Sequence, residues 1–151
     1  MINSNSMSSK ASSNIPQWLV IVFAVATLAG FVDASYLTAE HIRGSIPPCT
    51  LTGGCEQVLT SAYASVAGVP VSVMGMLYYG ALLVSVIAFF DTGDRRILHR
   101  ACWLAVAGFL ASLYFVYVQV FVIHALCLYC LISAVSSLVL AAVGTRIMRV
   151  D

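Results

Sequence analysis

Residues 101–144 read ACWLAVAGFLASLYFVYVQVFVIHALCLYCLISAVSSLVLAAVG. This stretch contains no Asp, Glu, Lys or Arg. It is about twice the ~20 residues that an α-helix needs to cross a hydrocarbon core of roughly 30 Å. We therefore predict two membrane spans, at about 101–123 and 126–144, joined by a tight turn at His124–Ala125.

Two further apolar runs, at about 18–37 and 69–90, have a similar length. The chain has 151 residues, of which 61% are hydrophobic and 9% charged, which leaves too little polar surface for a soluble domain. The expected fold class is an all-α membrane protein, a four-transmembrane-helix bundle at about 16–145. Residues 1–15, rich in Ser and Asn, are expected to be a disordered tail, and 146–151 a short cytoplasmic tail. The net charge of +1 does not indicate a nucleic-acid surface.

The orientation of the spans follows from the seven Lys and Arg residues. Six of them flank the spans on one side, whereas Arg43 lies on the other (the six are Lys10, Arg95, Arg96, Arg100, Arg146 and Arg149). The positive-inside rule makes the basic side cytoplasmic. Both termini are then expected in the cytoplasm, and the long loop at 38–68 on the outer face, where disulfides persist.

The loop at 38–68 is longer than connections without structure usually are. Gly53–Gly54 permits a sharp turn that brings Cys55 back towards Cys49. From Glu56 to Val66 apolar residues recur at helical spacing, which predicts a short helix that caps the outer end of the bundle.

Four of the five cysteines form two closely spaced pairs near the outer face. Cys127 and Cys130 share one face of a helix, near an N-terminus that favours a thiolate, so a reactive pair is predicted. For Cys49 and Cys55 alone, a static disulfide would be the commoner role. A second dithiol nearby favours a relay by thiol–disulfide exchange. Cys102, at the opposite end of its span, is expected to be a packing residue.

Several other residues are candidates for the chemistry. No dinucleotide fingerprint, P-loop or obvious haem ligand pair is present, so a quinone is the expected electron acceptor. The hydroxyl of Ser61 could bind a quinone carbonyl or be an ordinary surface group. Asp33 is either a functional intramembrane carboxylate or a hydrated one near the interface. His124 could steady the Cys127 thiolate or relay a proton. The aromatic residues of the middle spans are expected to pack in the bundle (Tyr78, Tyr79, Tyr114, Phe115 and Tyr117).

Taken together, these features resemble the vitamin K epoxide reductase family in its bacterial quinone-reductase form. The resemblance covers roughly residues 18–144, and it depends on the cysteine spacing combined with motifs in the other spans (Ser35-Tyr36-Leu37, Cys49-x5-Cys55, Ser61, Val69 to Gly75 with Tyr78-Tyr79, Ser112-Leu113-Tyr114 and Cys127-x-x-Cys130). It implies a four-helix bundle around a quinone of the menaquinone, ubiquinone or vitamin K type, with a loop half-helix as the cap.

The resemblance also implies a role for each paired cysteine. Cys127 and Cys130 would be the active-site pair, with Cys130 facing the quinone. Cys55 would form a mixed disulfide with Cys127, and Cys49 would exchange with a partner protein.

The resemblance places Ser61, Tyr78 and Phe115 where residues that line the quinone pocket are expected. No metal is expected, because no third or fourth ligand stands at a familiar spacing. Two positions depart from the vertebrate members of the family. Val71 stands where they carry a pocket asparagine, and Ala134 where they carry a tyrosine. These departures weigh against epoxide reduction and vertebrate-type inhibitor binding.

The expected function is that of a disulfide-generating thiol:quinone oxidoreductase of a bacterial inner membrane. Because the chain ends at Asp151, its partner is expected to be a separate, exported thioredoxin-fold protein. One alternative is a soft-metal-binding bundle with cysteine ligands and His41 or His124. Another is a structural four-span protein with a stapled loop, in which Cys127 and Cys130 could become Ala at little cost.

Overall fold

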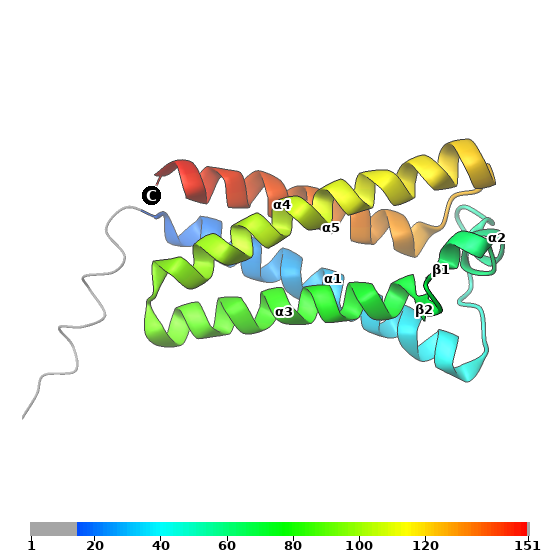
Figure 1. The fold of residues 1–151 in the computed structure, drawn as a ribbon, viewed down its shortest axis with the longest axis horizontal. Helices are drawn as coiled ribbons and strands as arrows, with labels where there is room; N and C mark the ends of the chain where they lie inside the picture. Colours follow the sequence, from blue (N-terminus) through cyan, green and yellow to red (C-terminus); the bar gives the residue numbers. More distant parts are fainter. Residues whose placement is uncertain (1–14, 151) are drawn as a thin grey trace, which may run out of the picture.

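The computed structural model describes residues 15–150, and four long helices dominate it (Figure 1). They are α1 (Gln17–Arg43), α3 (Val71–Thr92), α4 (Arg95–Tyr117), which the π-helix η2 (Val118–Ile123) continues, and α5 (Leu128–Val150). All four are long and apolar enough to span a membrane, so the predicted all-α, multi-pass fold is confirmed. Both α1 and α4 pack against α3 and α5, which closes a ring of four helices.

The two ends of the bundle differ in charge and in structure. At one end the described chain begins and finishes and α3 turns into α4; at the other lie the α1–α3 connection and the α4–α5 turn (Figure 1). We call the second the loop end. Arg43 lies there, in an ion pair with Glu40 at 3.4 Å. The other described arginines lie at the opposite end (Arg95, Arg96, Arg100, Arg146 and Arg149).

The helices extend beyond their predicted bounds. α1 continues past residue 37 to Arg43, where Gly44 at φ 69° ends it and donates its N–H to the carbonyl of His41. α4 begins at Arg95 rather than 101, because the side chain of Asp94 accepts the N–H of Arg96 at 2.9 Å and caps the helix.

The predicted tails have different outcomes. α5 continues to Val150, so residues 146–150 are helical. The predicted tail at 1–15 lies outside the described residues except for Ile15, which is buried in the bundle core.

The single loop helix predicted from Glu56 to Val66 is wrong. The segment consists of α2 (Cys55–Leu59), the 3₁₀ turn η1 (Ala62–Ala64) and a hairpin of β1 (Ser65–Val66) with β2 (Val69–Pro70).

Hydroxyl groups and turn residues explain these breaks. Thr60 and Ser61 donate their hydroxyls to the carbonyls of Glu56 and Val58, which satisfies the end of α2. Ala67 and Gly68, at φ 51° and 81°, form the two-residue turn of the hairpin. Since Val69 and Pro70 belong to β2, α3 begins at Val71 and not at 69.

Two clusters of buried side chains hold the molecule together. The larger lies between the four helices and includes Phe23, Tyr79, Leu140 and Cys102, whose burial fits its predicted packing role. The smaller lies at the loop end and consists of Cys55, Val58 and Cys127 with their partly buried neighbours. We call this smaller group the cysteine cluster.

The expectation that the aromatic residues pack inside the bundle is only partly correct. Tyr79 is buried, and Tyr78 and Phe115 are half-buried. Tyr114 and Tyr117, by contrast, are exposed on the outside of α4, where Tyr117 stacks on Phe121 with ring centroids 5.0 Å apart.

Candidate functional site: a disulfide beside a Cys-x-x-Cys pair

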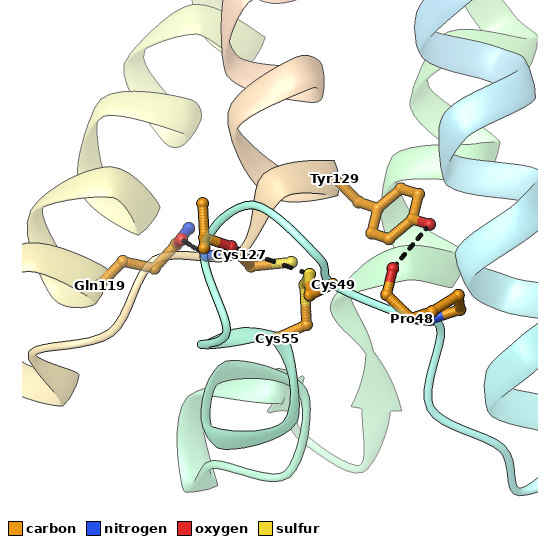
Figure 2. Close-up of a disulfide and its surroundings, with 7 residues drawn as sticks. Pro48, Cys49, Cys55, Gln119, Cys127 and Tyr129 are labelled. Carbon is orange, nitrogen blue, oxygen red and sulfur yellow. Dashed lines mark hydrogen bonds between the residues drawn. A yellow bond between two sulfur atoms is a disulfide. The ribbon is translucent and has the colours of Figure 1, made fainter.

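The loop pair is joined as a disulfide, with Cα atoms of Cys49 and Cys55 5.9 Å apart (Figure 2). Cys49 is half-buried, whereas Cys55, the first residue of α2, is 1% exposed. Of the two predicted turn glycines, Gly53 adopts the left-handed conformation, at φ 62°. Cys49 is therefore the sulfur of this pair that a soluble partner reaches more easily.

Gly54 has a different role from Gly53, because it permits a close contact between two backbones. A Cβ atom at Gly54 would lie 2.7 Å from the carbonyl oxygen of Leu126 and 2.8 Å from its nitrogen. Those distances are shorter than van der Waals contact, so a larger residue would displace one of the two segments. The loop therefore lies directly on the residue that precedes Cys127, and this brings Cys55 into the cysteine cluster with it.

Cys127 is held at the N-terminus of α5 by its backbone. Its carbonyl accepts the N–H of Leu131 at 3.0 Å, as expected of an N-cap residue. Its own N–H donates to the side-chain oxygen of Gln119 at 3.0 Å (Figure 2). The cysteine itself is 0% exposed. Its position is therefore tied both to the helix that it opens and to η2.

Sequence reasoning missed Gln119. The signal was available, because Gln119 is the one amide side chain in the apolar stretch 101–144. His124, which we considered as a partner of Cys127, is exposed and ends η2 at φ 57°. The side chain that accepts the backbone N–H of Cys127 is Gln119 instead.

The two thiols of the helix pair are chemically unequal. A hydrogen bond from the Cys130 thiol lowers the pKa of Cys127 to about 7, and the backbone N–H groups of Cys130 and Tyr129 act in the same direction. Burial and the negative charge of Asp33 oppose this shift. Since the thiolate is the nucleophile, Cys127 is the more nucleophilic sulfur of the helix pair.

A cavity of 640 Å³ lies between the helices and the loop, and Cys130 lines it. The three residues predicted for a quinone pocket, Ser61, Tyr78 and Phe115, line the same cavity. Val71 and Ala134, the two positions that depart from the vertebrate pattern, line it as well. The tertiary structure thus brings together residues from the loop, α3, α4 and α5 that are far apart in the sequence.

Comparison with known proteins agrees with this arrangement. The model of the vitamin K epoxide reductase family matches residues 21–145, a range that holds both cysteine pairs, all of α3 and α4, and most of α1 and α5. This chain belongs to the vitamin K epoxide reductase family.

A relative adds to this classification. Thiol-disulfide oxidoreductase LTO1 of Arabidopsis thaliana is 35% identical over 114 residues, which cover 68% of this chain and 30% of the relative. The chain therefore spans less than a third of that protein. This member of the family thus carries a disulfide beside a Cys-x-x-Cys pair, at the end of four helices that could span a membrane.

The cavity of this family member contains polar atoms that the protein leaves unpaired. Among the described residues, Oδ2 of Asp33 and Oη of Tyr78 are buried without a hydrogen-bond partner. Tyr79, next to Tyr78, is satisfied, because its hydroxyl donates to the carbonyl of Ser133 at 2.8 Å. Two polar atoms are thus left to meet a ligand.

The metal-binding alternative gains no support from the described geometry. Within residues 15–150 no group of three or more His, Cys, Asp or Glu side chains is placed to hold a metal ion. Cys49 and Cys55, two of the four thiolates considered as ligands, are joined to each other.

Proposed function

We propose that this protein is a disulfide-generating thiol:quinone oxidoreductase, which takes electrons from a thioredoxin-fold protein and delivers them to a quinone. One observation carries the proposal. The Cys-x-x-Cys pair is divided between two environments, with Cys127 buried beside Cys55 and Cys130 lining the cavity. The pair therefore connects a site of disulfide exchange with a ligand site.

The first half of the reaction is thiol exchange at the loop. A thiolate of the reduced partner attacks Cys49 and releases Cys55 as a thiolate. The partner's second thiol then resolves the mixed disulfide, so the partner leaves oxidised and the loop pair is reduced. The greater exposure of Cys49 supports its role as the sulfur that is attacked.

The second half moves the electrons inwards. The Cys55 thiolate attacks Cys127 in an oxidised helix pair and releases Cys130. Cys49 then attacks Cys55, which restores the loop disulfide and leaves Cys127 and Cys130 as thiols. The transfer therefore ends with an oxidised loop pair beside two thiols.

The cavity residues fit a quinone. Ligand sites commonly have volumes of about 300–1,000 Å³, and 640 Å³ falls within that range. The unpaired Oη of Tyr78 is a donor for a carbonyl oxygen, and Phe115 offers an aromatic face. A quinone bound there would take up the two electrons that the helix pair releases when its disulfide forms again, together with two protons, one of which comes from the Cys130 thiol.

Ser61 has a narrower role than the sequence indicated. Its hydroxyl donates to the carbonyl of Val58 at 2.7 Å, so its proton is already engaged. While that bond lasts, Ser61 can accept a hydrogen bond from a ligand but not donate one. We therefore assign the carbonyl donor to Tyr78 rather than to Ser61.

We further propose that the protein lies in a bacterial cytoplasmic membrane with the loop end outside and both termini in the cytoplasm. The described arginines support this, since all but Arg43 lie at the end opposite the loop. A disulfide at the loop end is consistent with an oxidising compartment there.

The test uses the purified protein in detergent with a reduced thioredoxin-fold oxidase and a soluble menaquinone or ubiquinone analogue. Quinone absorbance is followed for the wild type and for Ala variants of Cys49, Cys55, Cys127 and Cys130. We expect each variant to lose turnover with the protein partner. A Cys102→Ala variant, which alters a buried cysteine outside the cysteine cluster, is the matched control and keeps its rate.

Two results would overturn the proposal. Full turnover without Cys127 or Cys130 would leave the structural four-span alternative ahead. The second result is that the wild type shows no turnover with any partner or quinone tested. The metal-binding alternative would then be tested by measuring the metal content after mild reduction.

A further inference from the structure

Asp33 is a buried carboxylate that the thiol exchange described above does not use. It lies on α1, is 9% exposed, and its Oδ2 has no hydrogen-bond partner among the described residues. It lines the same cavity as Cys130. An ionisable side chain within a membrane-spanning helix is costly and marks a functional group.

The surroundings of Asp33 contain few groups that could share its role. The titratable side chains that line the cavity with it are His41 on α1, Tyr63 on η1, Tyr78 and Tyr79 on α3, and Cys130 on α5. Cys127 and Tyr129 are also close enough to interact electrostatically with the carboxylate. Of the described residues that line the cavity, none is Lys or Arg, so no fixed positive charge faces Asp33 there.

Because Cys127 is the thiolate of the pair and Cys130 keeps its proton, formation of their disulfide needs an acceptor for the Cys130 proton. Cys130 donates its thiol proton to the sulfur of Cys127, and that bond favours the Cys127 thiolate. When the two sulfurs join, the Cys130 proton must therefore go to another group. A neutral tyrosine has no site for an added proton, and Tyr79 is already bonded to Ser133. A carboxylate oxygen without a partner has such a site.

We propose that Asp33 is the proton acceptor of the cavity, which takes the proton of the Cys130 thiol when the Cys127–Cys130 disulfide forms. One S–H bond breaks at Cys130 and one O–H bond forms on Asp33. The electron pair leaves with the two-electron acceptor of the proposed function, on which this inference rests. Asp33 then holds a proton beside the ligand site.

The first test reads Cys130 directly and needs no quinone. The protein is reduced mildly, with the loop disulfide intact, and labelled with a lipophilic maleimide. Labelling of Cys130 is measured by peptide mass spectrometry. Removal of a base slows formation of the Cys130 thiolate, so Asp33→Asn should lower the labelling rate at least tenfold, and Asp33→Glu should restore part of it.

The direction of this effect separates proton transfer from electrostatics. If Asp33 acted only through its negative charge, Asp33→Asn would ease formation of a nearby thiolate, and labelling would become faster. Unchanged or faster labelling therefore overturns the proposal. Ser35→Ala is the matched control, because Ser35 is on the same helix and its Oγ is also buried without a partner. Slow labelling in His41→Gln with a normal rate in Asp33→Asn would assign the role to His41 and overturn the proposal as well.

A second measurement follows turnover in the full assay. General base catalysis contributes about 100-fold or more, so Asp33→Asn should lower kcat by roughly that factor. Exchange between the partner and the Cys49–Cys55 disulfide should keep its rate.

If wild-type protein reduces no quinone while Asp33→Asn still slows labelling of Cys130, the quinone is the wrong electron acceptor, but Asp33 remains the proton acceptor. A wild-type kcat in Asp33→Asn would overturn the role of Asp33 alone. Thermal unfolding of Asp33→Asn and Asp33→Glu confirms that both variants fold.

Discussion

The side-chain oxygen of Gln119 accepts the backbone N–H of Cys127 at 3.0 Å, and this bond fixes the reactive cysteine to η2. Gln119 is 3% exposed, so the bond is shielded from water. The backbone of the same residue holds the turn, because its carbonyl accepts the N–H of Ala125 at 3.1 Å. One residue therefore organises both the α4–α5 turn and the first residue of the Cys-x-x-Cys pair.

Replacement of Gln119 by Leu should weaken both stability and exchange. It leaves the buried N–H of Cys127 unpaired, which costs about 1–3 kcal/mol, and releases the cysteine from its position. The cost is measured by unfolding in detergent. The approach of the two sulfurs is measured by trapping the Cys55–Cys127 mixed disulfide with an added thiol oxidant in a Cys49→Ala, Cys130→Ala background. Val122→Leu, at an exposed position in the same π-helix, should change neither. A wild-type trapping rate in Gln119→Leu would contradict the positioning role.

Replacement of Gly54 by Ala should separate the two cysteine pairs. The added methyl group overlaps the backbone of Leu126, and relief of that overlap costs about 1–3 kcal/mol or moves the loop. We expect trapping of the Cys55–Cys127 mixed disulfide to slow about tenfold, which corresponds to about 1.4 kcal/mol. Reduction of the Cys49–Cys55 disulfide by a soluble dithiol should stay near the wild-type rate.

The matched control for Gly54→Ala is Gly80→Ala. A Cβ atom at Gly80 meets Phe31 at an ordinary contact distance of 3.5 Å. If both glycine variants exchange at the same rate, the close approach at Gly54 does not position Cys55.

The pH dependence of Cys127 should differ from that of an ordinary thiol. A pKa lowered to about 7 means that the thiolate is the minor form below pH 7 and the major form above it. An unperturbed cysteine makes this change at a higher pH. The difference in thiolate absorbance between reduced wild type and Cys127→Ser measures the titration. Cys130→Ala removes the hydrogen bond that is the main cause of the lowered pKa, so the titration of Cys127 should move to higher pH. An unshifted titration would rule out this hydrogen bond as the cause.

Tyr129 should hold the loop through its ring more than through its hydroxyl. Its Oη donates to the carbonyl of Pro48 at 3.4 Å, a long hydrogen bond (Figure 2). Its ring packs against the cysteine cluster and on Tyr36 of α1, with ring centroids 5.5 Å apart. Tyr129→Phe keeps the ring, so we expect a loss below about 0.5 kcal/mol. Tyr129→Ala loses the aromatic pair as well, worth about 0.5–1.5 kcal/mol, and should increase hydrogen exchange at residues 44–54. Equal exchange in the two variants would show that the ring contact is not what holds the loop.

Several features of the fold and site were predictable from local sequence. The four spans follow from the length of the apolar runs, because a bilayer requires about 20 apolar residues in a helix. The cysteine pairs follow from their spacing, and the family resemblance follows from that spacing combined with motifs in the other spans. Bounds and breaks were less predictable. Asp94 extended α4 by capping it, and the hydroxyls of Thr60 and Ser61 ended α2 where the apolar spacing predicted a continuous helix.

The sequence by itself determined that this chain is a four-span membrane protein with two reactive-looking cysteine pairs, since hydrophobic length and residue spacing are local properties. Only the tertiary structure decided which sulfur has which surroundings. The contact of Gly54 with Leu126 and the bond from Cys127 to Gln119 join segments that are far apart in the chain or meet across a turn. The cavity that joins Asp33 to Cys130 is formed by several helices together, so no pattern within one segment could have predicted it.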